Sequence, residues 1–252
     1  MPTTNITHTS VLSLLLLGAA CTEGKPELET EPTSDEREAG TFEDENGVPR
    51  DLLAGCTASI AEEDTEDGAI YLHRMTYDDN GYLMSESYED ISGEWVTFLQ
   101  YETRLDDLGR PETLIEDETW DIWTHTLTYD ADSWRIVKTT RLHELVKEGE
   151  SNVSEVARVW DAEGWTEEAY GCTERAVLGE GLRIAEKTTT CGDSEPDTEL
   201  YTWEGDRLRH LEIADGEWAL DADFQYDGGR LSRVDISGFF SASTTYTWDC
   251  PL

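Results

Sequence analysis

Histidines and carboxylates are the side chains with which this sequence could do acid–base or metal chemistry. The five histidines lie at positions 8, 73, 125, 143 and 210, and none has a second His or a Cys at the spacing of a metal site, so each is expected to be an exposed strand residue. The 57 acidic residues could supply a glycosidase pair, but among so many carboxylates two sequence neighbours carry no information. The motifs GxSxG and HExxH and a glycine-rich phosphate loop are missing. The sequence therefore predicts neither an enzyme nor a bound metal or other cofactor.

Two acidic segments look like the start of a calcium-binding loop. They are DDNG from Asp78 and DADS from Asp130. Both lack the later glutamate that would bind the ion with two oxygens, and both are accounted for as turns between strands. Calcium is therefore left open only as the weaker alternative.

The amino terminus has the features of an export signal. An apolar run from Val11 to Ala20 is too short to span a bilayer and suits the core of a signal peptide. Small residues precede Cys21, and this arrangement resembles the lipobox of bacterial lipoproteins, which implies a lipid-modified Cys21. The lipobox leucine is displaced by one residue and no basic residue precedes the apolar run, so ordinary secretion to the periplasm or the exterior is the alternative, and a buried apolar strand a further one.

The chain is divided accordingly into three segments. Residues 1–20 are the predicted signal peptide. Residues 21–50 hold the lipidated Cys21 and an acidic stretch with almost nothing to bury, which we expect to be a disordered tether. Residues 51–252 are the predicted folded domain. By the sorting rule of the lipoprotein family, Thr22 after the cysteine favours the outer membrane or cell surface over retention at the inner membrane.

Four further cysteines form an even set, as disulfides in an exported chain would. A turn in LGEGLR lies midway between Cys172 and Cys191, so two strands folded at that turn would place these cysteines opposite each other. By elimination, Cys56 then pairs with Cys250 and joins the start of the domain to its end. That long closure would stabilise the fold by about 4 to 5 kcal/mol.

The net charge of −39 limits the possible partners. Such a surface repels nucleic acid and anionic lipid head groups, so we exclude nucleic-acid binding. The acidity could be a solvated surface, an adaptation to high salt, or a means of attracting calcium or a cationic partner. The sequence does not separate these three readings.

Alternating polar and apolar residues dominate positions 70 to 250, as in WVTFLQYETRL. The period of two, with many aromatic and β-branched residues, predicts half-exposed strands. The segment RLHELVKEG, residues 141–149, could be a helix or a strand that ends in a glycine turn.

One turn pattern recurs between these strands. In YDDNGYL, Asp78 caps the local backbone and Gly81 takes the positive φ of a short hairpin loop, so Tyr77 should lie opposite Leu83. The loops of WEGDRL and YDGGRL differ in length, yet they keep an aromatic residue opposite a leucine. The predicted structural residues of these two turns are Trp203 and Leu208, and Tyr226, Asp227 and Leu231. Related turns are LDDLGRP, YDADSWR, WDAEGWT and a final WDC.

These turns resemble the YD repeats, or RHS repeats, of bacterial surface and secreted proteins, whose pattern is close to Tyr-Asp-x-x-Gly-Arg-Leu. The resemblance covers about residues 70 to 250 and implies one β-hairpin per repeat, joined into a spiralling sheet. We expect an all-β fold, an antiparallel meander of roughly 12 to 16 strands in a twisted sheet that is open or partly curled. The encapsulating and self-cleaving roles of large members are not carried over, because their core motif is missing here.

The function expected from these features is that of a non-enzymatic, membrane-anchored lipoprotein in envelope structure or partner contact. Its partners would be the membrane, through the lipid, and an envelope protein or glycan. The alternative is a carbohydrate-binding module that uses exposed Trp and Tyr residues, such as Trp123, Trp134 and Trp165. Core packing is the competing role for the same aromatic rings.

Overall fold

A computed structural model describes residues 50–251, except 65–67, 119, 131–132, 134, 148, 180–182 and 216–217. The predicted signal peptide, Cys21 and all of the predicted tether except Arg50 lie outside the described residues. A 3-10 helix, η1 (Arg50–Leu52), precedes sixteen strands. Within the described ranges, no helix is long and apolar enough to cross a membrane.

The strands follow one another along the chain with short connections. Their bounds are β1 Thr57–Asp64, β2 Ile70–Tyr77, β3 Leu83–Glu89, β4 Trp95–Leu105, β5 Pro111–Glu118, β6 Asp121–Tyr129, β7 Ile136–Leu145, β8 Glu150–Trp160, β9 Gly164–Ala169, β10 Cys172–Leu178, β11 Ile184–Cys191, β12 Asp197–Glu204, β13 Arg207–Asp215, β14 Trp218–Asp227, β15 Arg230–Gly238 and β16 Ala242–Asp249. The segment left open between helix and strand, 141–149, is therefore the end of β7 and the turn after it.

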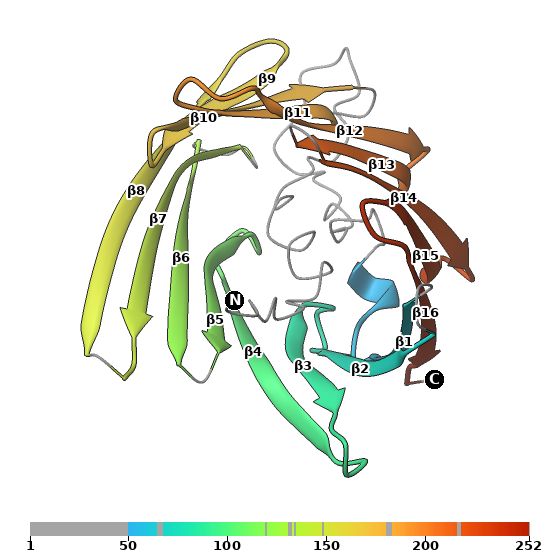
Figure 1. Cartoon of the computed structure of the whole chain (residues 1–252). Coiled ribbons are helices and arrows are strands. Elements are labelled where there is room, and N and C mark those ends of the chain that lie inside the picture. The colour runs from blue at the N-terminus through green and yellow to red at the C-terminus, as the bar shows by residue number, and fades with distance from the viewer. Residues whose placement is uncertain are drawn as a thin grey trace, which may run out of the picture.

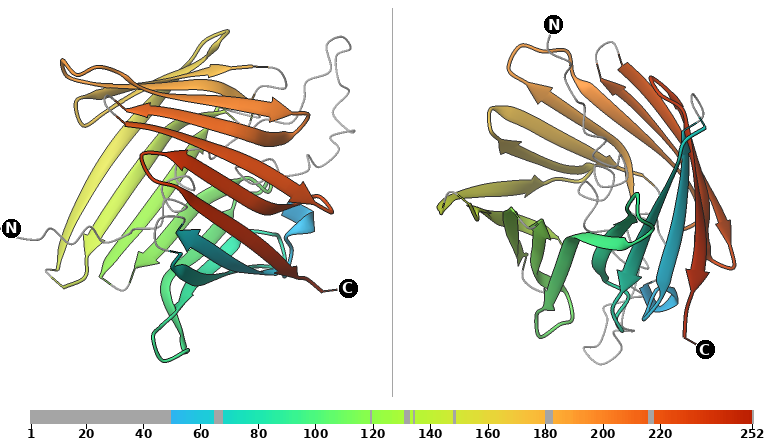
Figure 2. Two further views of the ribbon diagram at one scale, coloured as in Figure 1. Left: turned by 45° about the vertical axis from the view of Figure 1, so that its right-hand side comes forward. Right: turned by 60° about the horizontal axis from the view of Figure 1, so that its bottom comes forward.

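The sheet is closed, and this corrects the predicted open or partly curled meander. Each strand pairs antiparallel with its sequence neighbour, and β1 also pairs with β16 over Thr57–Asp64 and Ala242–Asp249. The result is a barrel of sixteen strands in which the two edge strands of the sheet, β1 and β16, lie side by side. Figure 1 and the right-hand view of Figure 2 show this closure. The all-β class is confirmed, but the open architecture is wrong.

The two faces of the barrel wall differ in burial. Along β14, Ala222 and Phe224 are buried, whereas Asp223 and Gln225 are exposed. Because the described chain has no second layer outside the sheet, the buried face is the interior. The largest apolar cluster occupies this face on β13 to β16 and includes Leu211, Ala222, Phe224, Val234 and Ile236.

The recurrent turns have the predicted local chemistry. Asp78 accepts hydrogen bonds from the amides of Asn80 and Tyr82 through one carboxylate oxygen, at 2.8 Å each. Gly81 has a φ of +78°, and a Cβ there would lie 2.0 Å from the carbonyl oxygen of Arg50. Glycine is thus required at this position both by the turn and by the close approach of η1.

The predicted aromatic–leucine pairs are cross-strand neighbours. The structure pairs Tyr77 with Leu83, Trp203 with Leu208, and Tyr226 with Leu231. Asp227 lies opposite Arg230 at the start of its turn. These residues therefore set the hairpin registers.

The aromatic residues of these turns also link consecutive hairpins, which the sequence did not predict. Five of these rings donate a hydrogen bond to the main-chain oxygen of the first or second residue in the return strand of the preceding hairpin. The five donor–acceptor pairs are Tyr129 and Pro111 (2.6 Å), Trp160 and Ile136 (2.7 Å), Trp203 and Ile184 (2.8 Å), Tyr226 and Leu208 (2.8 Å), and Trp248 and Leu231 (2.6 Å).

An arginine covers the ring in four of these links. It is the residue just before the accepting oxygen, so ring and guanidinium come from adjacent hairpins. The arginine–ring pairs are Arg110 and Tyr129 (4.3 Å), Arg135 and Trp160 (5.3 Å), Arg183 and Trp203 (5.4 Å), and Arg207 and Tyr226 (5.4 Å). Such contacts add a cation–π attraction to each hydrogen bond. The arginine of the repeat thus contacts the next hairpin, and Arg110 in addition pairs with Asp106 of its own turn.

Register irregularities explain why the sheet closes. One occurs just before the aromatic or aliphatic residue that opens each of six turns. A bulge bends its strand and increases the local twist. Because all six lie at the same end of the barrel, their bends add and curve the wall in one direction.

The joint between β1 and β16 has several supports. The predicted Cys56–Cys250 disulfide is confirmed, with the two Cα atoms 4.2 Å apart. The rings of Tyr77 and Trp248 lie 5.7 Å apart across the same joint. Helix η1 contacts turns on both sides of it, through the Arg50 oxygen beside Gly81 and the Leu52 oxygen, which accepts a 2.7 Å hydrogen bond from Arg230.

The disulfides should contribute unequally to stability. Removing Cys56–Cys250 with serines should lower the free energy of unfolding by about 5 kcal/mol, and removing Cys172–Cys191 by about 3 kcal/mol, because the first closes the longer loop. Urea unfolding of the two double variants measures both values. Equal losses would contradict a role of Cys56–Cys250 in holding the barrel closed.

The links between hairpins are tested by deleting one hydroxyl. Tyr226→Phe removes the donor to Leu208 and keeps the ring, so unfolding should become easier by about 1 kcal/mol. Tyr88→Phe is the matched control, since Tyr88 is 40% exposed on β3 and its hydroxyl has no hydrogen bond among the described residues. Thermal unfolding followed by circular dichroism compares the two, and an effect of the control as large as that of Tyr226→Phe would refute the link.

Candidate functional site

Ionisable and aromatic side chains gather on the interior face of β3 to β8. Cross-strand pairs place Tyr101 beside Glu116, Glu116 beside Trp123, and Trp123 beside His143. Glu86 reaches the same group from β3, since Tyr101 donates a 2.7 Å hydrogen bond to it. We call Glu86, Tyr101, Glu116, Trp123 and His143 the acid–aromatic cluster.

The carboxyl groups of this cluster hold protons more tightly than usual. Glu86 is only 4% exposed, and burial raises its pKa against the opposing effect of the Tyr101 hydrogen bond. Burial, with the charges of Glu118 and Glu86, raises the pKa of Glu116 to about 7. The cluster therefore contains a carboxyl group that changes charge near neutral pH.

The imidazole rings on the interior face contact aromatic and charged neighbours. His143 stacks on Trp123, with ring centres 3.8 Å apart and planes within 4°, and its Nε2 lies 3.6 Å from a carboxylate oxygen of Asp121. Burial, followed by the charge of Arg141, lowers the pKa of His125. The expectation that every histidine is an exposed strand residue is wrong for His125 and His143, because closure turns their face of the wall inward.

A second group of charges continues the interior from β7 to β12. Arg158 donates two hydrogen bonds to one oxygen of Glu167, at 2.9 and 3.1 Å, and Arg141 approaches the other oxygen at 3.7 Å. Lys187 lies 2.7 Å from Glu199, whose other oxygen accepts the hydroxyl of Tyr201. Most of these charges are paired with one another, as buried charges must be, whereas Nε of Arg141 is buried without a hydrogen-bond partner.

The interior groups can bind protons and orient polar contacts. The acid–aromatic cluster lacks a nucleophilic Ser or Cys, and its most buried carboxyl, Glu86, is already hydrogen-bonded by Tyr101. Sequence reasoning missed the cluster because its members come from β3 to β7 and meet only through the barrel register. The alternation of residues along each strand does place Glu116 and Trp123 on the same face of the sheet. This alternation was the signal in the sequence from which the cluster could have been found.

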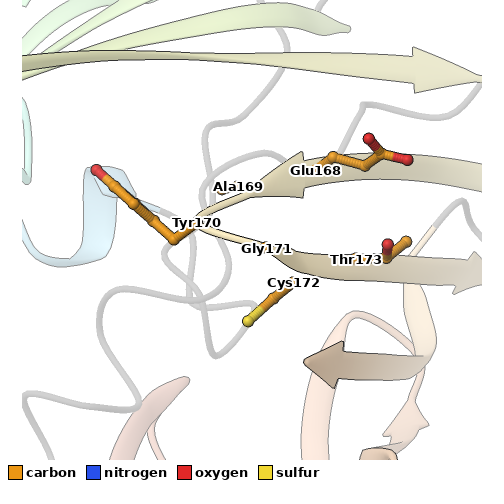
Figure 3. Close-up of a pocket in the computed structure, with 6 residues that line it drawn as sticks. All are labelled: Glu168, Ala169, Tyr170, Gly171, Cys172 and Thr173. Carbon is orange, nitrogen blue, oxygen red and sulfur yellow. The ribbon is translucent and has the colours of Figure 1, made fainter. Parts of the chain in front are cut away.

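The disulfide residues lie where they were predicted. Cys172 and Cys191 are joined and are direct cross-strand partners, so this predicted pair is confirmed together with Cys56–Cys250. A shallow depression of about 290 Å³ lies at the β9–β10 turn and is lined by Glu168 to Thr173. Figure 3 shows Glu168 and Thr173 on one side of the hairpin and Cys172 on the other. One carboxylate in an open depression does not form a catalytic group.

The predicted calcium segments are used otherwise or fall partly outside the described chain. The Asp78 oxygen is occupied by turn amides, and residues 131–132 of DADS are not among the described ones. Another group, on the outer face of β13 and β14, has metal-binding types of side chain. Ligand atoms of His210, Glu212 and Asp221 lie within 4.8 Å of one another, but Nδ1 of His210 already contacts Asp223 at 2.9 Å.

Comparison with known proteins identifies no family for this chain. No family model matches the chain, and no curated protein matches it. A porin-like protein from Bacteroides uniformis is 11% identical, with a TM-score of 0.38 over 77% of this chain and 97% of that one. The structure of TcdB2-TccC3-Cdc42 is 14% identical, with a TM-score of 0.29 over 73% of this chain and 11% of that one. Likenesses this small establish neither a family nor a function.

The raised pKa of Glu116 predicts a pH effect on stability. Between its ordinary value of 4.5 and its folded value of about 7, the unfolded chain binds fewer protons, so stability falls as the pH rises. Glu116→Gln should match the parent at pH 4 and exceed its stability above pH 7 by about 1 kcal/mol, allowing for partial solvent exposure. Urea unfolding from pH 4 to 8 measures this, with exposed Glu112→Gln as control. Parallel curves for parent and Glu116→Gln would contradict the prediction.

Proposed function

We propose that the protein is an exported, non-enzymatic lipoprotein, whose barrel is attached to the cell envelope through a lipid on Cys21 and acts by contact with partners. The observation that carries the proposal is a closed barrel, cross-linked by two disulfides, whose outer face is polar on β14 to β16. Structural disulfides persist in oxidising compartments outside the cytoplasm. They are consistent with the export signal predicted at residues 1–20.

The outer face supports attachment beside the membrane rather than within it. Outward positions on adjacent strands include Asp223 and Gln225 on β14, Arg233 and Asp235 on β15, and Thr245 on β16. A barrel that spans a membrane presents an apolar band to lipid, and charges at mid-strand would be costly there. The lipid on Cys21, with the tether to residue 50, would supply the attachment at the outer membrane or cell surface.

A role without catalysis has support from the interior. Basic side chains on β8 and β11 are engaged in ion pairs, Arg158 with Glu167 and Lys187 with Glu199, and the buried carboxyl of Glu86 accepts the hydroxyl of Tyr101. Groups that neutralise one another stabilise a wall and are poorly placed to act on a substrate. The kinship with YD repeats remains a proposal too, supported by the hairpin registers and by the arginine–ring contacts between hairpins.

The alternative of a carbohydrate-binding module has weaker support. Trp165 is 3% exposed and covered by Arg158, Trp123 is covered by His143, and Trp134 lies outside the described residues. A sugar-binding platform needs open ring faces, and Trp123 and Trp165 do not offer them.

Lipid attachment is tested by replacing the modified residue. Cys21→Ser should move the protein from the membrane fraction to the soluble exported fraction and abolish incorporation of a labelled fatty acid. Thr22→Ala is the control, since it keeps the cysteine. Continued membrane retention of Cys21→Ser would remove the lipoprotein proposal. A soluble wild-type protein would instead support ordinary secretion.

A further inference from the structure

Most tryptophan rings of the barrel are covered by other side chains of the same chain. Arginine, lysine, histidine or tyrosine lies over each of them. The covered rings and their partners are Trp95 with Arg74, Trp120 with Lys147, Trp123 with His143, Trp160 with Arg135, Trp165 with Arg158, Trp203 with Arg183, and Trp248 with Tyr77. A contact between an indole and another side chain of the chain is therefore the rule among the described tryptophans, and in five of these seven cases that side chain is an arginine or lysine.

Trp218 differs from these five tryptophans. It is 49% exposed, and its ring packs edge-to-face against the ring of Phe239. Phe239 is itself 62% exposed. Among the residues that the structure describes, no basic side chain lies over the Trp218 ring, so this aromatic pair presents an uncovered face.

Two carboxylates lie beside this pair. Asp215 is the cross-strand partner of Trp218, and such partners share a face. Asp197, on the neighbouring strand β12, has its pKa raised by partial burial and by a hydrogen bond with Asp215. In the described part of the chain neither aspartate forms an ion pair with a basic residue, and nearby Lys187 is taken by Glu199.

The four residues lie at one end of the barrel. Asp197 begins β12, Asp215 ends β13, Trp218 begins β14, and Phe239 follows β15. This end is opposite the end that carries the recurrent Asp-Gly turns and η1, where the described chain begins. An attachment through the residues before Arg50 would leave it accessible to partners.

We propose that Trp218, Phe239, Asp215 and Asp197 form a site for a lysine or arginine side chain on a basic polypeptide segment. The inference rests on the proposed role in partner contact and names the chemistry of the partner. Lys147 over Trp120, with Nζ 3.1 Å from the ring centre, is the arrangement that an incoming cation would copy. The aspartates would bind the charge through charge-assisted hydrogen bonds.

A polypeptide fits this site better than a metal ion. A divalent cation seeks several oxygen ligands and gains nothing from an aromatic pair, whereas Phe239 offers apolar surface to the methylene stem of a lysine or arginine. The net charge of −39 would also speed the approach of any polycation. Because this attraction acts on all cations, the test must separate it from local recognition.

The experiment measures binding of fluorescent hexalysine and hexaarginine to the full-length protein in detergent, by anisotropy at physiological ionic strength. Trp218→Ala and the double variant Asp197→Asn/Asp215→Asn should each bind about tenfold more weakly. Trp120→Ala and Asp193→Asn/Glu195→Gln are the controls, and they should change affinity less than about twofold. The second control removes the same charge from exposed positions of the β11–β12 turn. Circular dichroism and disulfide mapping confirm that each variant is folded.

Four results would overturn the site. The first is equal weakening by the two charge-removing variants, which would show attraction to net charge alone. The second is unchanged binding in Trp218→Ala. The third is binding of calcium that depends on Asp197 and Asp215 but not on Trp218, which would mark a metal site. Binding of acetylated hexalysine as tight as that of hexalysine would likewise exclude recognition of charge. None of these results depends on Cys21, so failure of the site and failure of the lipoprotein proposal are distinguishable.

Discussion

The structure depends on one contact that is repeated between hairpins: a ring at the start of a turn donates a hydrogen bond to the main chain of the preceding hairpin. Trp160, Trp203 and Tyr226 illustrate it. Within a hairpin, the turn alone sets the register. This contact sets the position of one hairpin against the next, and the arginine before the accepting oxygen covers the ring. The repeat is therefore a connector between units as well as a turn.

Closure follows from that repetition and changes what the side chains face. An open ribbon of this many strands would separate its edges by about 70 Å. The bulges at one end bend six hairpins the same way, β1 pairs with β16, and no edge is left to pair with another chain. Once closed, the wall has an interior, and residues such as Glu86 and Glu167 become buried charges that require partners. The acid–aromatic cluster is a consequence of this enclosure.

Particular residues show how far sequence reasoning could go. The Cys56–Cys250 pair was derived by elimination, and it already joined the two ends of the sheet, which an open meander could not do. The predicted disulfide therefore already indicated a closed barrel, and the sequence analysis did not predict one. The hairpin LGEGLR was read as a turn only, yet Arg183 within it covers Trp203 as the other repeat arginines cover their rings. Glu116, His143 and Trp218 could not be assigned, because their neighbours are set by strand registers and not by spacing along the chain.

The sequence by itself determined the strands, the turn chemistry, both disulfides and the acidic character, because each depends on local spacing, residue type or simple pairing. It also contains the arguments for export, which rest on the first twenty-one residues. Only the tertiary structure decided that the sheet is closed, which face is inside, which carboxyl is protonated near neutral pH and which tryptophan stays uncovered. The physical reason is that small bends at each bulge accumulate around the wall, and burial and charge contacts depend on where that accumulation brings distant strands together.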